Sequence, residues 1–150
     1  MIHLVIVSHS RQLAHGVAEL ARQMAPAALQ VSPVGGLDEA GGAPVLGVDA
    51  LEIAEAIRRV DAPDGTLILV DLGSAVLSAE TALDLLEPEQ RRRCRISNAP
   101  LVEGAVVAAV EAGLQHSLDD VNRAAEAACA ITKVWAAPPS SAPQEGDDRS

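Results

Sequence analysis

The chain has 150 residues, which suits one folded domain, and 49% of them are apolar, as in a globular protein. Aromatic residues make up only 1%, with no Phe, no Tyr and a single Trp, so the chain has no aromatic platforms on which nucleic-acid bases could stack. The formal net charge of −10 also argues against binding to a phosphate backbone. We therefore expect no nucleic-acid partner.

The cysteines and the N-terminal residues indicate a compartment. Cys94 and Cys129 have neither the spacing of metal ligands nor that of a disulfide framework, and we expect two buried or partly buried thiols in a reducing cytoplasm. The apolar run 2–7 lacks the basic flank and the cleavage site of a signal peptide. No apolar run reaches the roughly 18 residues that a membrane-spanning helix needs. The sequence therefore predicts a cytoplasmic protein without membrane insertion.

Strands and helices are predicted to alternate along the chain. Strands are expected at 2–7, 29–34, 66–70 and 93–97, and helices at about 13–24, 50–60, 75–86, 100–110 and 118–129. Asp49 is the expected N-cap of the second helix, and Pro88 is expected to end the third. The apolar face of the first helix is predicted from residues at helical spacing: Leu13, Val17, Leu20, Ala21 and Met24.

This order of elements predicts an α/β fold, an open parallel sheet with helices on both faces. Residues 1–136 are expected to form the domain, and 137–150, rich in Pro, Ser and acids, a disordered tail. In open parallel sheets, functional sites form beyond the carboxyl ends of the strands. The loops at that edge carry His9, Gly35–Gly36, Asp71–Ser74 and Asn98–Pro100.

His9 is the first candidate for chemistry. It lies between Ser8 and Ser10, directly before a predicted helix whose free N–H groups and dipole favour anions. A neutral imidazole there can attack a phosphoryl group and carry it as phosphohistidine. The alternative is structural: Ser10 caps the helix, and His9 only fills the loop.

Asp71 is the second candidate, because it follows the strand 66–70. If that strand neighbours the first, its carboxylate can accept a hydrogen bond from one ring nitrogen of His9 and leave the other free to react. Gly73 and Ser74 then offer backbone N–H groups and a hydroxyl for an anion. Asp71 could instead be a helix cap or a turn former. The chain has no glycine-rich nucleotide-binding motif and no metal-ligand pattern.

Four segments carry a resemblance to a known family. They are 7–24 (VSHSRQLAHGVAELARQM), 69–80 (LVDLGSAVLSAE), 98–105 (NAPLVEGA) and the glycine-rich stretch before Asp49. Together they resemble the IIA domain of the mannose-type phosphotransferase system, over about residues 1–130. The resemblance is strongest to the phosphocarrier subunits of phosphotransferase-dependent dihydroxyacetone kinases. Sugar-transport members tend to have Gly-Gly-Ser-Pro in the second segment, where this chain has Gly73–Ser74–Ala75.

The resemblance implies a sheet of order 2-1-3-4 and a homodimer. It implies that His9 is transiently phosphorylated by HPr, that Asp71 orients it, and that Ser10, Gly73 and Ser74 bind the phosphoryl group. The acceptor would be ADP on a nucleotide-binding (DhaL-type) subunit that acts with a dihydroxyacetone-binding (DhaK-type) subunit. Magnesium and ADP would belong to that partner, and this chain would bind no cofactor. HPr and enzyme I are expected as separate proteins.

Two other functions are compatible with the same fold and with a phosphorylated His9. One is a sugar-transport IIA component that phosphorylates a IIB protein. The other is a regulator whose phosphohistidine only changes the binding of a partner. One departure from the family is Val48 after Leu46–Gly47, where a hydroxyl cap is common, and Asp49 is expected to replace that cap. His3 is expected to be structural, and His15 and His116 to be exposed.

Overall fold

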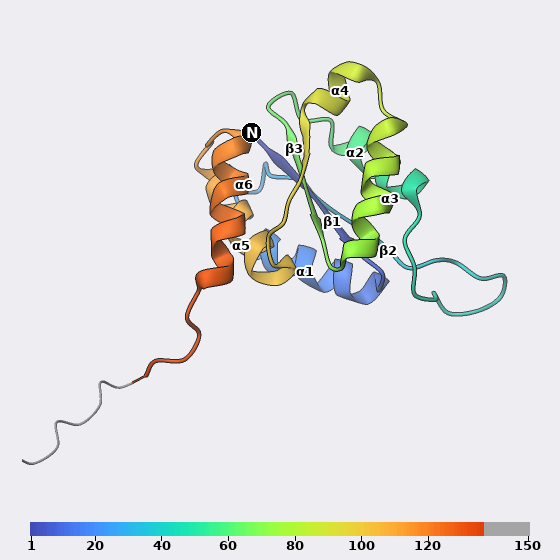
Figure 1. The fold of residues 1–150 in the computed structure, drawn as a ribbon, viewed down its shortest axis with the longest axis horizontal. Helices are drawn as coiled ribbons and strands as arrows, with labels where there is room; N and C mark the ends of the chain where they lie inside the picture. The colour runs from blue at the N-terminus through green and yellow to red at the C-terminus, as the bar shows by residue number, and fades with distance from the viewer. Residues whose placement is uncertain (137–150) are drawn as a thin grey trace, which may run out of the picture.

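Four short strands form the centre of the structure, a computed structural model that describes residues 1–136 (Figure 1). The strands are β1 (His3–Ser8), β2 (Val31–Gly35), β3 (Thr66–Val70) and β4 (Cys94–Ile96). The helices are α1 (Arg11–Gln23), α2 (Ala50–Val60), α3 (Gly73–Asp84), α4 (Pro88–Arg92), α5 (Leu101–Gly113) and α6 (Leu118–Ala127), and a 3₁₀ turn (Ala128–Ala130) follows. The tail expected at 137–150 lies outside the described residues.

The sheet is parallel throughout, and its order is β2-β1-β3-β4, which confirms the expected topology. The central strands β1 and β3 are apolar and almost wholly buried, as is typical of strands covered on both faces. The register pairs Ser8 with Gly35 and Val7 with Val70. The carboxyl end of β1 therefore lies between the ends of β2 and β3.

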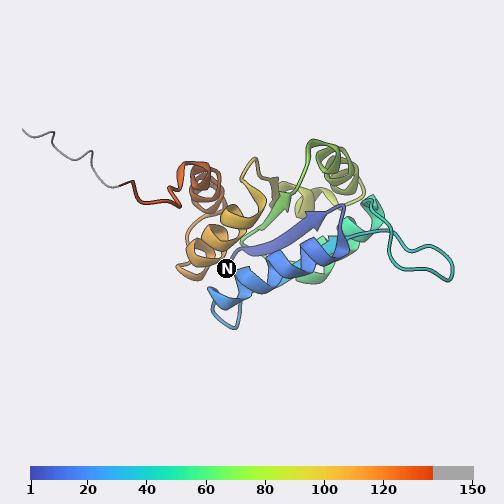
Figure 2. The same ribbon diagram turned by 90° about the horizontal axis from the view of Figure 1, so that it is seen from below.

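Helices cover both faces of the sheet and enclose two separate apolar cores. On one face, Leu4 and Ile6 pack with α1, α5 and α6. On the other face, Val5 and Val7 pack with α2 and α3. Figure 2 shows α1 and α3 on opposite sides of β1. Alternate residues of one strand thus serve the two cores, as the pleat of a strand requires.

The buried residues of the helices are mainly alanines, although α2 also buries Ile53 and Ile57, and the sheet supplies most of the other large side chains. The buried residues of α1 are Ala14, Val17, Ala18 and Ala21. The prediction that Leu13, Leu20 and Met24 face the core is wrong, since all three are exposed. Small side chains let a helix lie close to the sheet, and this leaves longer residues at the edges of the contact in solvent.

Three local predictions need correction. The third helix begins at Gly73 rather than near Ala75 and ends at Asp84, before Pro88. Pro88 instead occupies the first turn of α4, where its missing N–H costs nothing. Cys94 is partly buried as expected, but Cys129 is exposed. Burial raises the pKa of the Cys94 thiol to about 11, although nearby Arg93 lowers it.

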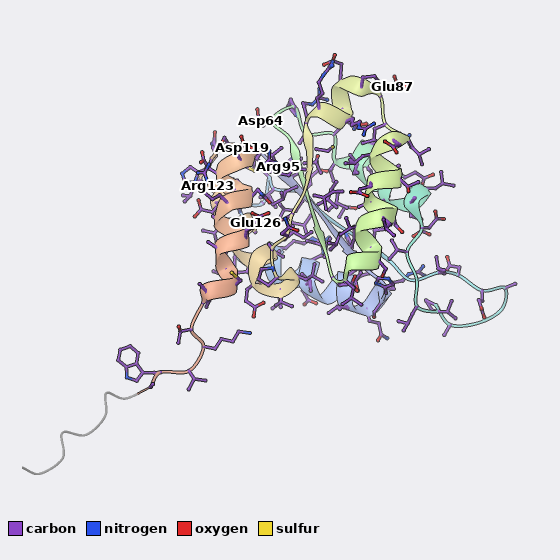
Figure 3. The ribbon with its side chains drawn as sticks, in the orientation of Figure 1. Asp64, Glu87, Arg95, Asp119, Arg123 and Glu126 are labelled. Carbon is purple, nitrogen blue, oxygen red and sulfur yellow. The ribbon has the colours of Figure 1, made fainter. Side chains whose placement is uncertain are left out.

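The basic run near β4 is neutralised within the chain. Each of its arginines contacts a carboxylate, in the pairs Arg91–Asp84, Arg92–Glu89, Arg93–Asp61 and Arg95–Asp119. Figure 3 shows the last pair, in which Arg95 reaches Asp119 on α6 at 2.8 Å. This run therefore offers no free cationic patch. Among residues 1–136, no helix is long and apolar enough to cross a membrane.

The outer edge of the sheet at β2 is covered by side chains from α1. Arg22 donates a hydrogen bond to the carbonyl of Val31, and Arg11 donates one to the carbonyl of Gly35 at 3.0 Å. Between these alternate residues lies Pro33, which has no N–H.

Candidate active site

His9 lies in the two-residue loop that joins β1 to α1. Beside it, the chain leaves β3 at Asp71, whose N–H donates to the carbonyl of Val7 at 3.1 Å and so continues the ladder between the strands. Parallel pairing of β1 with β3 therefore brings His9 and Asp71 together, although they are 62 residues apart. The contact lies where the sequence analysis expects it.

The carboxylate of Asp71 accepts four kinds of hydrogen bond at this point. The donors are His9 Nδ1 at 3.0 Å, the His9 backbone N–H at 2.9 Å, the Ser8 hydroxyl at 3.0 Å and the Leu72 N–H at 2.8 Å. Burial raises the pKa of Asp71, but the hydrogen bonds from His9, Ser8 and Leu72 outweigh it and hold that pKa below its usual value. Asp71 is thus an anion at neutral pH.

An anionic Asp71 determines the tautomer of the neutral His9 ring. A carboxylate can only accept a hydrogen bond, so Nδ1 carries the proton and Nε2 keeps its lone pair. The Ser74 hydroxyl lies 2.8 Å from Nε2 and donates to it. The His9 side chain is 25% exposed. Its unprotonated nitrogen therefore faces the first turn of α3.

The two helices that begin beside His9 differ in how their N-termini are capped. At α1, the Ser10 hydroxyl accepts the N–H of Leu13 at 3.2 Å and caps the helix. At α3, the N-cap position is Leu72, and no side chain caps the helix. A Cβ added to Gly73 would meet nothing within 4 Å, so the space beside Gly73 is open. Uncapped N–H groups at a helix N-terminus attract anions.

A buried serine supports the loop from behind. The Ser8 hydroxyl donates to Asp71 and accepts the N–H of Ser10 at 3.0 Å. Ser8 has no exposed surface, so this hydroxyl has no access to water. The sequence analysis did not assign Ser8 a positioning role. A serine that ends a buried strand is the signal that could have suggested one.

The loop between β2 and α2 also holds His9. Gly47 donates its N–H to the His9 carbonyl at 3.0 Å. Arg11 donates to the carbonyls of Gly35 and Gly36 and pairs with Asp38 at 2.7 Å. A side chain at Gly36 would crowd Arg11, and its φ of +71° also favours glycine. The contacts of Arg11 and Gly47 were not predicted, because they join loops distant in sequence.

Other expected features lie away from Nε2. Asp49 caps α2 by accepting the N–H of Leu51 at 2.8 Å, as predicted despite Val48. His3 accepts the N–H of Gln30, and His116 pairs with Glu111 on the surface. These two histidines have no contact with His9.

The loop after β4 is fixed by α6. The Asn98 N–H donates to the Glu126 carboxylate at 3.1 Å, and Glu126 is labelled on α6 in Figure 3. Within residues 1–136, no group of three or more His, Cys, Asp or Glu is arranged to hold a metal ion. The groups near Nε2 that can act on a ligand include the His9 ring, the Ser74 hydroxyl and the N–H groups at the start of α3.

Comparison with known proteins identifies relatives that span most of the domain. A DhaM phosphoryl donor subunit of PEP-dependent dihydroxyacetone kinase from Escherichia coli K12 is 45% identical over 122 residues, or 81% of this chain. Only 25% of that relative is covered, and 28% of the Klebsiella michiganensis DhaM, so the chain spans about a quarter of their length. The DhaM of kinase 2 from Listeria innocua is 40% identical, and 94% of it is covered.

Solved structures agree with the fold. The crystal structure of the unknown-function protein EF1359 matches with a TM-score of 0.73 and 35% identity, over 90% of this chain and 98% of that one. The DegV family protein Cg2579 from Corynebacterium glutamicum, at 23% identity and a TM-score of 0.58, shares the fold alone. The model of the EIIA-man family, PTS system fructose IIA component, matches residues 3–122. The chain belongs to the EIIA-man family, as a DhaM-like domain.

Proposed function

We propose that this chain is a phosphohistidine carrier that receives a phosphoryl group on His9 Nε2. One observation supports this most directly. Asp71 holds Nδ1 in its protonated form, and the free Nε2 faces Ser74 and the uncapped start of α3. A nucleophile and an anion-binding helix end therefore meet at one point.

In the proposed transfer, the lone pair of Nε2 attacks the phosphorus of a phosphorylated donor. The P–Nε2 bond forms while the bond from phosphorus to the donor breaks, and the donor keeps that electron pair. The ring gains positive charge during the attack, and the Asp71 carboxylate stabilises it through Nδ1–H. Onward transfer reverses these roles, with the His9 ring as the leaving group.

Ser74 and Gly73 are the proposed phosphoryl-binding residues. The Ser74 hydroxyl, which donates to Nε2 in the unloaded ring, would turn to a phosphoryl oxygen once Nε2 is occupied. The backbone N–H groups at the start of α3 would bind the other oxygens. The Ser10 hydroxyl is engaged as the cap of α1, so its proposed share in phosphoryl binding is through its remaining hydroxyl proton.

The names of the relatives support a role as phosphoryl donor within a dihydroxyacetone kinase. Those relatives are phosphoryl donor subunits of PEP-dependent dihydroxyacetone kinases. We propose phosphorylated HPr as the donor to His9, and ADP held by a DhaL-type subunit as the acceptor, with a DhaK-type subunit binding dihydroxyacetone. Magnesium and nucleotide are assigned to the partner. A cytoplasmic location and a homodimer are part of the same proposal.

The experiment uses purified chain with phosphoenolpyruvate, enzyme I and HPr, followed by mass spectrometry. We expect the mass of one phosphoryl group on the parent and none on His9→Ala. The adduct should be labile in acid and stable in base, as a phosphoramidate is. An acid-stable adduct, or one that persists in His9→Ala, would contradict the assignment.

The acceptor is then tested with the loaded protein. We expect loss of the phosphoryl group to ADP bound on the DhaL-type subunit, with ATP as the product. Transfer to a IIB protein alone would show a sugar-transport component instead. Stable loading with transfer to neither would show a regulatory phosphohistidine. Circular dichroism of His9→Ala provides the control, because His9 lies in a loop and its removal should leave the fold intact.

A further inference from the structure

A hollow of about 550 Å³ lies against the outer edge of β2, towards the amino end of the sheet. Its lining comes from the end of α1, from the residues that lead into β2 and from the last turn of α2. A helix that follows a parallel strand begins at the carboxyl edge of the sheet and ends near the amino edge. The hollow is therefore separate from the site of His9, and its volume is in the range of small-ligand sites.

The bottom of the hollow is apolar. Leu29, Val31 and Val60 line it, and all three are buried because they pack into the cores on the two faces of the sheet. Val31 adds a backbone donor, because Arg22 binds its carbonyl from the outer side, and the N–H of a strand residue points to the same side as its carbonyl. The bottom of the hollow thus offers apolar surface and one N–H group.

Two arginines border the hollow, Arg22 from α1 and Arg59 from α2, and no carboxylate lines it. The last turn of a helix favours basic residues through the helix dipole, which accounts for an arginine at each position. The dipole does not account for their convergence, because α1 and α2 lie on opposite faces of the sheet. The hollow is therefore bordered by positive charge from both faces.

These two arginines differ from most cations of the chain. Within residues 1–136, every arginine and lysine except Arg22, Arg58 and Arg59 pairs with a carboxylate. Arg58 donates instead to the carbonyl of Leu85. In the same part of the chain, Arg59 has no ion pair or side-chain hydrogen bond, although Glu55 lies one turn before it on α2. Two cations that no carboxylate of the described residues neutralises thus border one hollow, in a chain whose net charge is −10.

We propose that this hollow binds a small organic dianion, of the type of a phosphate monoester with an apolar body, between Arg22 and Arg59. Guanidinium groups donate paired hydrogen bonds that match the oxygens of a phosphate, and two of them neutralise two negative charges. The apolar body would lie on Leu29 and Val60, where its burial adds to the free energy of binding. This second site does not depend on the function proposed for His9.

The test uses nuclear magnetic resonance on the ¹⁵N-labelled full chain, with phenyl phosphate as the probe. We expect saturable shifts of the amide signals of Ala27, Val31 and Ser32, which line the hollow. Benzoate, with one negative charge, and inorganic phosphate, without an apolar body, should each bind at least about fivefold more weakly. Equal binding of either would overturn the class of ligand, and no shift at these three amides would overturn the site.

Arg59→Gln removes one charge from the hollow without breaking a contact within residues 1–136. We expect the Kd for phenyl phosphate to rise about fivefold, as for a charge-assisted hydrogen bond lost at an accessible position. Arg58→Gln is the matched control, because Arg58 is the neighbouring residue, carries the same charge and does not line the hollow. Its Kd should stay at the parental value. An equal rise in both variants, or no rise in Arg59→Gln, would overturn the proposal.

Arg22→Lys tests the geometry of the other arginine. The lysine keeps the charge and can still donate to the Val31 carbonyl, but it lacks the planar fork of a guanidinium. We expect the Kd for phenyl phosphate to rise about threefold, with a melting temperature near that of the parent. Parental affinity in this variant would overturn the role assigned to the Arg22 fork.

The amide signals of Gly73 and Ser74 report on the His9 site in the same spectra. Shifts there belong to the phosphoryl site of the proposed function and should be unaffected by Arg59→Gln. Shifts confined to Gly73 and Ser74 would overturn the hollow as a site and leave the proposed function standing. Shifts at Ala27, Val31 and Ser32 that weaken in Arg59→Gln would support the hollow, whatever His9 does.

Discussion

The starts of α1 and α3 lie on either side of His9, and they use the same kind of residue differently. At α1, the Ser10 hydroxyl caps the helix by accepting an N–H. At α3, the Ser74 hydroxyl turns to Nε2 of His9, and no side chain caps the helix. A capped end contributes stability, whereas an uncapped end keeps its N–H groups for an anion. The difference predicts that Ser10 affects stability more than Ser74 does, and that Ser74 affects transfer more than Ser10 does.

Asp71→Asn should break this arrangement most strongly, because the carboxylate turns Nε2 towards α3. An amide could face Nδ1 with its oxygen or its NH₂, so the tautomer would no longer be selected, and the ring would lose its counter-ion during attack. We expect single-turnover loading from phosphorylated HPr to slow by about 10²-fold, at the lower end for orienting carboxylates. A folded variant within about twofold of the parent would show that Asp71 is only structural.

The two serines test the comparison directly. Ser74→Ala should slow loading by about tenfold, because one donor to the phosphoryl group is lost while the N–H groups of α3 remain. Its melting temperature should stay near that of the parent. Ser10→Ala should instead lower the free energy of unfolding by about 1 kcal/mol, and it should slow loading less than Ser74→Ala does, because the Ser10 hydroxyl is engaged mainly as a cap. Urea denaturation and single-turnover kinetics on both variants measure the two effects, and reversed results would refute the comparison.

Ser8→Ala should combine smaller effects of both kinds. It removes one donor to Asp71 and leaves the partly buried N–H of Ser10 without its acceptor. We expect a loss of about 1–3 kcal/mol in the free energy of unfolding, and loading slowed only a few-fold because Asp71 keeps its other donors. Unchanged stability in urea denaturation would mean that this hydroxyl does not support the loop.

Of these predictions, the pH dependence of the melting temperature has the smallest expected effect. The lowered pKa of Asp71 means that its contribution is fully present above the unfolded value, near pH 4, and is lost as pH falls through the lower folded value. The melting temperature of the parent should therefore fall more steeply below pH 4 than that of Asp71→Asn. Parallel curves from pH 7 to pH 3 would contradict the assigned shift.

Much of this site could be predicted from local sequence, and the reasons are physical. Apolar strands followed by polar loops indicate a parallel sheet. The pairing of β1 with β3, which places Asp71 beside His9, was implied by the family resemblance rather than by local sequence. The support from Gly47 could not be predicted, because it joins loops that are distant in sequence. Ser8 did carry a signal, as a serine at the end of a buried strand, but its role was missed. The exposure of Leu13 was also missed. Hydrophobicity marks a leucine for the core, while close packing of α1 leaves room only for smaller residues.

The cover on β2 has a consequence for how the domain behaves at high concentration. Free strand edges are templates on which other chains can pair and aggregate. At β2, the outward carbonyls of Val31 and Gly35 are already bound by arginines, and Pro33 offers no N–H between them. The outer edge of β2 therefore offers a foreign strand fewer free hydrogen-bonding groups, which lowers its tendency to template aggregation.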